Sequence, residues 1–171
     1  MPTHIALLRA VNVGGTGKLP MAELRARCTA LGFENVRTYI ASGNLVLESK
    51  LAAAKVQATL ERLVHEMLGK PAAVLMRSRE ELEALLAANP YKDAAGNRVL
   101  IVLLEKAPPK DALNGWKTPG DEQLTMIGRE LFIHFPSGQG SSKLKVPFQD
   151  IGTGRNLNTV RTLLAMATGQ A

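Results

Sequence analysis

The order of apolar segments in the first 76 residues constrains the fold of this chain more than any other feature. Four strand-like segments alternate with two amphipathic helical patterns: strands at 3–11, 36–40, 45–48 and 72–76, helices at 20–31 and 51–68. Residues 3–11 are apolar on both faces, which is typical of a central, fully buried strand. The order strand, helix, strand, strand, helix, strand is the split βαβ, or ferredoxin-like, arrangement.

The second half repeats this order in part. It holds a helical pattern, a strong strand, a short helical stretch, a hairpin and a closing helix, at 79–88, 98–104, 111–114, 124–135 and 153–167. We therefore expect an α+β fold with two ferredoxin-like halves, residues 1–77 and residues 78–171, each with an antiparallel sheet.

Composition indicates a compact cytoplasmic protein. Of the 171 residues 46% are hydrophobic, which is enough for a packed core. No apolar run approaches the ~20 residues of a membrane-spanning helix, so no membrane association is expected, and the N-terminus lacks a signal-peptide pattern. The one cysteine, Cys28, falls on the apolar stripe of the first helix. It is predicted to be a core residue, and a single cysteine fits a reducing compartment.

The net charge of +6 and the isoelectric point of 9.7 favour an anionic partner. The basic residues are scattered along the chain and form no dense run. An ordinary basic surface therefore stays an alternative.

The loop at 12–20 is the first candidate binding segment. It holds three glycines and a lysine: Gly14, Gly15, Gly17 and Lys18. Glycines beside a helix N-terminus let backbone N–H groups approach an anion, and the lysine adds a charge. The segment is not a P-loop, because Asn12 stands where that motif has glycine and Leu19 where it has Ser or Thr. A tight turn that needs glycine is the structural alternative.

The turn at 42–44 is the second candidate, through its expected position. In a split βαβ sheet the first and second strands are parallel with one strand between them. Their ends then lie at one edge, about 10 Å apart. We expect Gly15 and Gly43 at the same end of the first sheet, with Arg9 near the end of its first strand, and a shared polar edge is a better site than either segment alone.

The start of the last helix, 153–159, is the third candidate. Arg155 and Asn158 are three residues apart and would face one ligand on a helix. Thr153 or Asn156 as a helix cap is the alternative. We also hypothesise that Arg155, Asn156 and Asn158 reach the glycine-loop edge of the first half.

Other chemistry has little support in the sequence. His4, His65 and His134 stand apart without a second ligand at metal-binding spacing, so no metal site is predicted. No motif of a nucleophile with its base occurs. The sequence indicates no particular cofactor and leaves catalysis open.

Several segments resemble the domain-of-unknown-function family 1697. They are the opening segment 6–24, the stretches 31–33, 35–40 and 42–44, and the later segments 89–90 and 155–160. This resemblance implies a bacterial α+β protein with ferredoxin-like halves and no assigned activity. The chain departs from the family pattern at three positions, with Ala10 in place of glycine, Ala41 in place of glutamine and Leu157 in place of tryptophan, and 145–152 is short.

The leading hypothesis is binding, with enzymatic conversion left open, of a small anionic, phosphate-bearing ligand at the glycine-loop edge. The predicted ligand-binding residues also match the family's signature segments: Arg9, Asn12, Gly14, Gly15, Lys18, Ser42, Gly43, Asn44, Arg155, Asn156, Asn158 and Thr159. One alternative is a nucleic-acid-binding protein, which the charge and a fold shared with RNA-binding modules favour. Another is an interaction module that forms a homodimer through its sheet edges.

Overall fold

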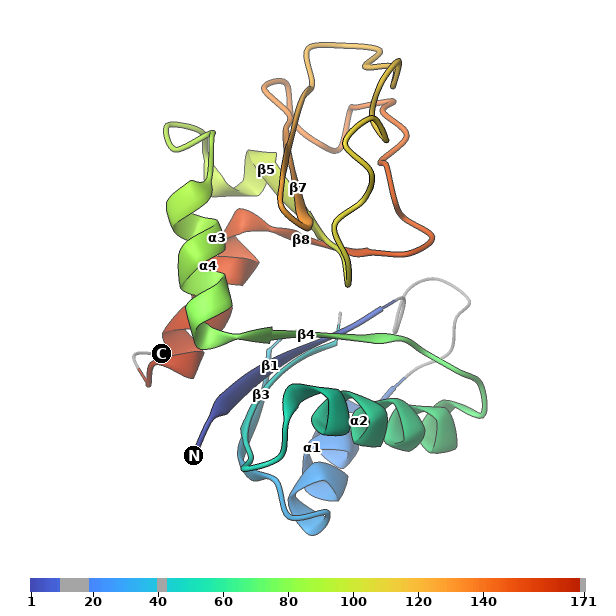
Figure 1. The fold of residues 1–171 in the computed structure, drawn as a ribbon, viewed down its shortest axis with the longest axis vertical. Coiled ribbons are helices and arrows are strands. Elements are labelled where there is room, and N and C mark those ends of the chain that lie inside the picture. The colour runs from blue at the N-terminus through green and yellow to red at the C-terminus, as the bar shows by residue number, and fades with distance from the viewer. Residues whose placement is uncertain (10–18, 40–42, 170–171) are drawn as a thin grey trace. The chain divides into compact units, whose positions relative to one another are not determined.

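The computed structural model describes residues 1–9, 19–39 and 43–169 (Figure 1). The chain divides into two compact units, Met1–Glu83 with Thr162–Ala171, and Ala84–Arg161. Each unit is built around one four-stranded sheet. No helix in the described ranges is both long and apolar enough to cross a membrane.

The first unit has the predicted ferredoxin-like order. Its elements are β1 (Thr3–Leu8), α1 (Met21–Ala30), β2 (Glu34–Tyr39), β3 (Asn44–Glu48), α2 (Ala53–Leu68) and β4 (Val74–Ser78). The strands form sheet A in the order β2-β3-β1-β4, with every neighbouring pair antiparallel. β1 and β2 are therefore parallel and separated by β3, which confirms the predicted topology.

The core of this unit lies between sheet A and its two helices. Ala6 and Leu8 on β1 pack in one cluster with Leu24 of α1 and Leu60 of α2, and both helices lie on the same side of the sheet in Figure 1. Cys28 of α1 is fully buried in this cluster, as the sequence predicted. Burial raises the pKa of its thiol from 9.0 to about 11.

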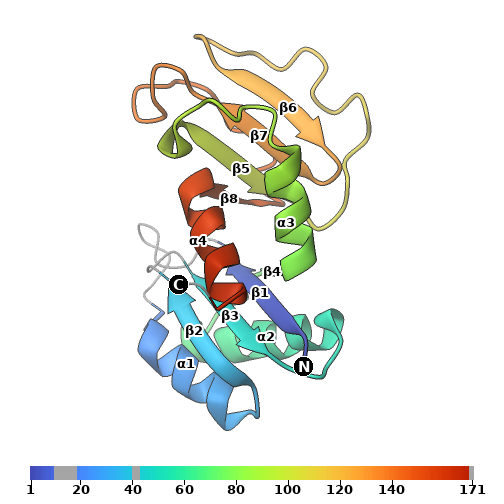
Figure 2. The same cartoon turned by 90° about the vertical axis from the view of Figure 1, so that its left-hand side faces the viewer.

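The second unit repeats the strand order. It contains the end of α3 (Arg79–Ala88), the short 3-10 turn η1 (Gly96–Arg98), β5 (Val99–Leu103), β6 (Gln123–Ile127), β7 (Glu130–His134), β8 (Thr153–Asn156) and the start of α4 (Leu157–Ala167). Sheet B has the order β6-β7-β5-β8 (Figure 2), again antiparallel throughout. This is the order of sheet A when β5 takes the place of β1, so the α+β fold with two ferredoxin-like halves is correct.

Two local predictions for the second half are wrong. Residues 153–156, expected as helix, form β8, because they pair with Leu100–Leu103 of β5 and the helix begins only at Leu157. The helix expected at 111–114 is a series of turns, in which Ala112 N–H bonds to Pro109 O and Trp116 N–H to Leu113 O.

The turns replace a helix as a cover for sheet B. Leu100 and Val102 pack against loop residues Leu113, Val146 and Phe148 on one face of this sheet. Loops thus take the place that α1 and α2 have in the first unit. Part of α4 belongs to the first unit, where Arg37 of β2 donates a hydrogen bond to the Met166 carbonyl.

The raised pKa of Cys28 predicts a loss of stability at alkaline pH. The folded thiol keeps its proton up to about pH 11, whereas the unfolded thiol ionises above about pH 9, so this contribution is fully present below pH 9 and is lost as the pH rises toward 11. Between pH 7 and pH 10 the native chain should lose ~1 kcal/mol more unfolding free energy than Cys28→Ala. Urea denaturation of both proteins at the two pH values measures this, and parallel losses would contradict a buried, protonated thiol.

Candidate functional site

β1 and β2 end at one edge of sheet A. Asn44 of β3 pairs with Leu7 on one side and with Tyr39 on the other. Leu8 N–H also donates to the Gly43 carbonyl at 2.8 Å. The ends of the two parallel strands therefore meet at a shared edge, as predicted.

The glycine loop itself lies outside the described residues. This holds for Asn12, Gly14, Gly15, Lys18 and Ser42. The expected proximity of Gly15 to Gly43, and the hypothesis that the start of α4 reaches this loop, stay predictions.

Arg9 directly follows β1 at this edge. Its backbone N–H donates to Ala73 O at 2.9 Å, which extends the pairing with the segment before β4. Its side chain is half-buried, and its Nε is buried without a hydrogen-bond partner among the described residues. Buried polar atoms are nearly always paired, so an unpaired guanidinium donor is unusual and suits an acceptor from outside the chain.

Gly43 and Asn44 stand at the start of β3. Gly43 has a φ of 86°, a conformation that favours glycine. The Asn44 side chain is fully buried, and its Nδ2 donates to the Tyr39 carbonyl at 2.9 Å. The structure thus gives both residues a role in the geometry of the edge.

The third candidate segment spans the end of β8 and the start of α4. Asn156 caps α4, since its Oδ1 accepts from Thr159 N–H at 2.8 Å, and Thr159 is itself buried. Asn158 is exposed and lies against Gly96, where an added Cβ would be 1.9 Å from the Asn158 Oδ1. Arg155 is on the strand and not on the helix, so it does not share a helix face with Asn158.

Arg155 is buried in sheet B. Its guanidinium donates to Thr153 Oγ1 at 2.5 Å and to the Gly154 carbonyl at 2.9 Å. Burial lowers the pKa of this guanidinium to about 10. Its neighbour Gly154 faces Leu100 and the loop-covered side of the sheet, so Arg155 points to the opposite face.

The first half contains an equivalent arginine. Arg77 of β4 pairs with Ile5 of β1, as Arg155 of β8 pairs with Ile101 of β5. Arg77 is also buried and donates to the carbonyl of the preceding residue, Met76, at 2.9 Å.

A helix cap follows each of these arginines. Ser78 Oγ accepts from Glu81 N–H at the start of α3, and Glu81 Oε1 accepts from Ser78 N–H, a reciprocal capping box. Asn156 is the equivalent capping residue of α4. The succession of buried arginine, cap and helix is thus a repeated element of the fold, and it gives Arg155 and Asn156 structural roles.

Removal of either buried arginine is expected to destabilise the protein. Arg155→Ala and Arg77→Ala should each lower the unfolding free energy by about 2–4 kcal/mol, because a cavity forms and hydrogen-bonded groups lose their donor. Arg161→Ala, at an exposed position of α4, is the control and should stay within ~0.5 kcal/mol. Urea denaturation distinguishes them, and an unchanged Arg155→Ala midpoint would favour a ligand-binding role for Arg155.

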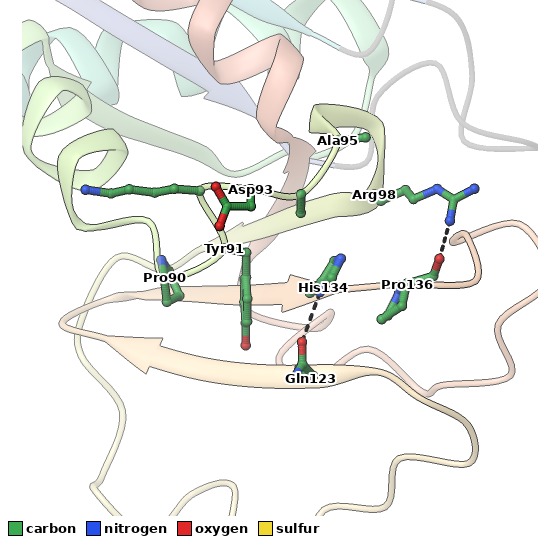
Figure 3. A pocket seen from close by; sticks show the side chains of 10 residues that line it. Pro90, Tyr91, Asp93, Ala95, Arg98, Gln123, His134 and Pro136 are labelled. Carbon is green, nitrogen blue, oxygen red and sulfur yellow. Dashed lines mark hydrogen bonds between the residues drawn. The ribbon is translucent and has the colours of Figure 1, made fainter.

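A further hollow, lined by polar and aromatic side chains, lies in the second unit (Figure 3). Tyr91, Arg98 and His134 line it. Sequence analysis missed it, because the residues come from separate segments and the Asn89-Pro90 pair indicates only a helix stop. In the described part of the chain, no group of His, Cys, Asp and Glu is arranged to hold a metal ion.

Comparison with known proteins agrees with the fold and assigns no activity. A solved structure, described as the conserved bacterial protein SP0830 from Streptococcus pneumoniae, superposes with a TM-score of 0.80 at 27% identity, over 97% of this chain and 98% of that one. None of the curated proteins compared with the chain matches it. The family described as protein of unknown function (DUF1697) matches residues 1–132. The chain therefore belongs to the DUF1697 family.

Proposed function

We propose that this protein binds a small anionic, phosphate-bearing molecule at the edge of sheet A where β1 and β2 end. Arg9 carries the proposal, since its buried Nε has no hydrogen-bond partner among the described residues. A phosphate oxygen would satisfy this donor with a charge-assisted hydrogen bond. The pairing of Asn44 with both Leu7 and Tyr39 supports the proposal, because the ends of both strands then lie at one edge.

The start of α1 adds a second favourable feature. Its N-cap residue is Pro20, whose side chain makes no hydrogen bond to the helix. A helix N-terminus favours negative charge, and the sequence places three glycines and Lys18 just before it. A cytoplasmic location, which the single buried cysteine favours, completes the proposal.

The proposal predicts that Arg9→Gln weakens anion binding with little effect on folding. Calorimetric titration of the full chain with inorganic pyrophosphate should show saturable binding. The affinity should be about tenfold or more lower in Arg9→Gln. The melting temperature without ligand should change little, because the lost Nε makes no described hydrogen bond.

Arg62→Gln is the matched control, since it removes the same charge from an exposed position on α2. It should bind pyrophosphate like the native chain. Equal affinity of native chain and Arg9→Gln would overturn the proposal.

Binding to nucleic acid is the second candidate, and the isoelectric point of 9.7 favours it. A protein that neutralises several backbone phosphates loses about 10³- to 10⁵-fold in affinity between 50 and 200 mM salt. Under the proposed function we expect no RNA oligonucleotide binding at about 0.15 M salt, while pyrophosphate still binds. Fluorescence anisotropy at several salt concentrations measures this, and tight binding with the steep slope would make nucleic acid the ligand.

A further inference from the structure

The second unit contains a hollow of about 720 Å³ beside the ends of β6 and β7. The segment between α3 and β5 forms one side of it, and Gln123 and His134 of the two strands line another. Figure 3 shows Tyr91, His134 and Arg98 around this space. Its volume lies within the ~300–1,000 Å³ range of small-molecule sites.

Tyr91 is held in place at three points. Its N–H donates to Asn89 Oδ1 at 2.9 Å, and its carbonyl accepts from Ala94 N–H at 3.0 Å. Its hydroxyl shares a hydrogen bond of 2.6 Å with Thr125 Oγ1 on β6. A ring fixed in this way would lose little conformational entropy when a ligand binds.

His134 extends the aromatic surface. The rings of Tyr91 and His134 have centroids 5.2 Å apart and an interplanar angle of 33°. The imidazole Nδ1 lies 2.9 Å from Gln123 Oε1, an acceptor to which it can donate. Among the described residues none hydrogen-bonds to Nε2, which leaves that nitrogen to a ligand.

Arg98 adds a cation to the lining of the hollow. Val99 pairs with His134 and Phe135 N–H donates to the Arg98 carbonyl at 2.8 Å, so Arg98 adjoins the end of β7. Its exposed guanidinium donates to the Pro136 carbonyl. Lys92 and Asp93 also line the hollow, so its lining carries two cationic side chains and one carboxylate.

We propose that this hollow binds a free mononucleotide, with the base on the Tyr91–His134 rings and the phosphate on Arg98. Stacking on an aromatic side chain recognises a base, and a guanidinium recognises a phosphate. A nucleic-acid strand requires a succession of stacking positions along a basic groove. This hollow offers one ring pair with one adjacent guanidinium, which suits a single nucleotide. The site shares no residue with the edge of sheet A.

Titration of the full chain with adenosine 5′-monophosphate tests the proposal. We expect saturable binding by calorimetry, and backbone amide shifts in NMR spectra at Tyr91, Arg98 and His134. Tyr91→Leu should weaken binding roughly 5- to 100-fold through loss of stacking. Arg98→Gln should weaken it by about tenfold or more.

Two variants serve as controls. Tyr91→Phe keeps the ring and should bind close to native affinity. Lys106→Gln removes the same charge as Arg98→Gln at an exposed position beyond the other end of β5, and should have no effect. If Tyr91→Leu fails to fold, the amide shifts of the native chain still locate the nucleotide.

The ligand series separates this site from the other candidates. Adenosine and ribose 5-phosphate should each bind more weakly than the nucleotide, because each lacks one of the two contacts. Equal affinity for ribose 5-phosphate, amide shifts only near Arg9 and Gly43, or no saturation at millimolar nucleotide would each overturn the proposal. Tighter binding of an RNA oligonucleotide, with a steep salt dependence, would show that the ligand of this site is a polymer and not a free nucleotide. Arg9→Gln should leave nucleotide affinity unchanged, so this site and the sheet A site can fail separately.

Discussion

Each sheet contains a central strand, β1 in sheet A and β5 in sheet B, that is hydrogen-bonded on both sides and buried on both faces. In β1, Ile5 to Leu8 are at most 1% exposed, and both β3 and β4 pair with them. A strand that is apolar on both faces cannot have its register set by alternation alone, because a slip by one residue would still bury apolar groups. At the end of β1, the glycine turn at Gly43 and the buried amide of Asn44 provide polar contacts that favour one register.

The strand order of each sheet accounts for the position of its buried arginine and of the helix cap that follows it. In both sheets the outer strand next to the central strand, β4 or β8, carries a buried arginine and leads directly into a capped helix. Arg155 and Asn156 fit this repeat, whereas the Nε of Arg9 has no hydrogen-bond partner among the described residues. Among the described residues of the signature segments, Arg155 and Asn156 thus have roles in the fold, and Arg9 is the one on which the proposed anion site rests.

Sequence patterns predicted the elements whose signal is local. The apolar run of β1 and the helix stop at Asn89-Pro90 are signals of this kind. Most helices and strands were predicted from such local signals. β8 could not be predicted, because Thr153 to Asn156 include a glycine and an asparagine, which disfavour strands, and only pairing with β5 makes them one. Tyr91 and His134 meet through tertiary packing, which no spacing in the sequence reveals. The edge of sheet A was predictable in its topology, since the ferredoxin-like order alone makes β1 and β2 parallel.

The two halves share a topology, yet they differ at the edge where anion binding is proposed. The backbone bond from Leu8 N–H to Gly43 O has an equivalent in the second half, from Leu104 N–H to Arg129 O. The position after Leu8 is Arg9, whereas the position after Leu104 is Glu105. A carboxylate there disfavours an anion, so the proposed phosphate site has no counterpart in the second half. The hollow at Tyr91 adjoins the other end of β5, next to Arg98, so it is not a second copy of the sheet A site. The same strand order therefore supports two chemically distinct candidate sites at opposite ends of equivalent strands.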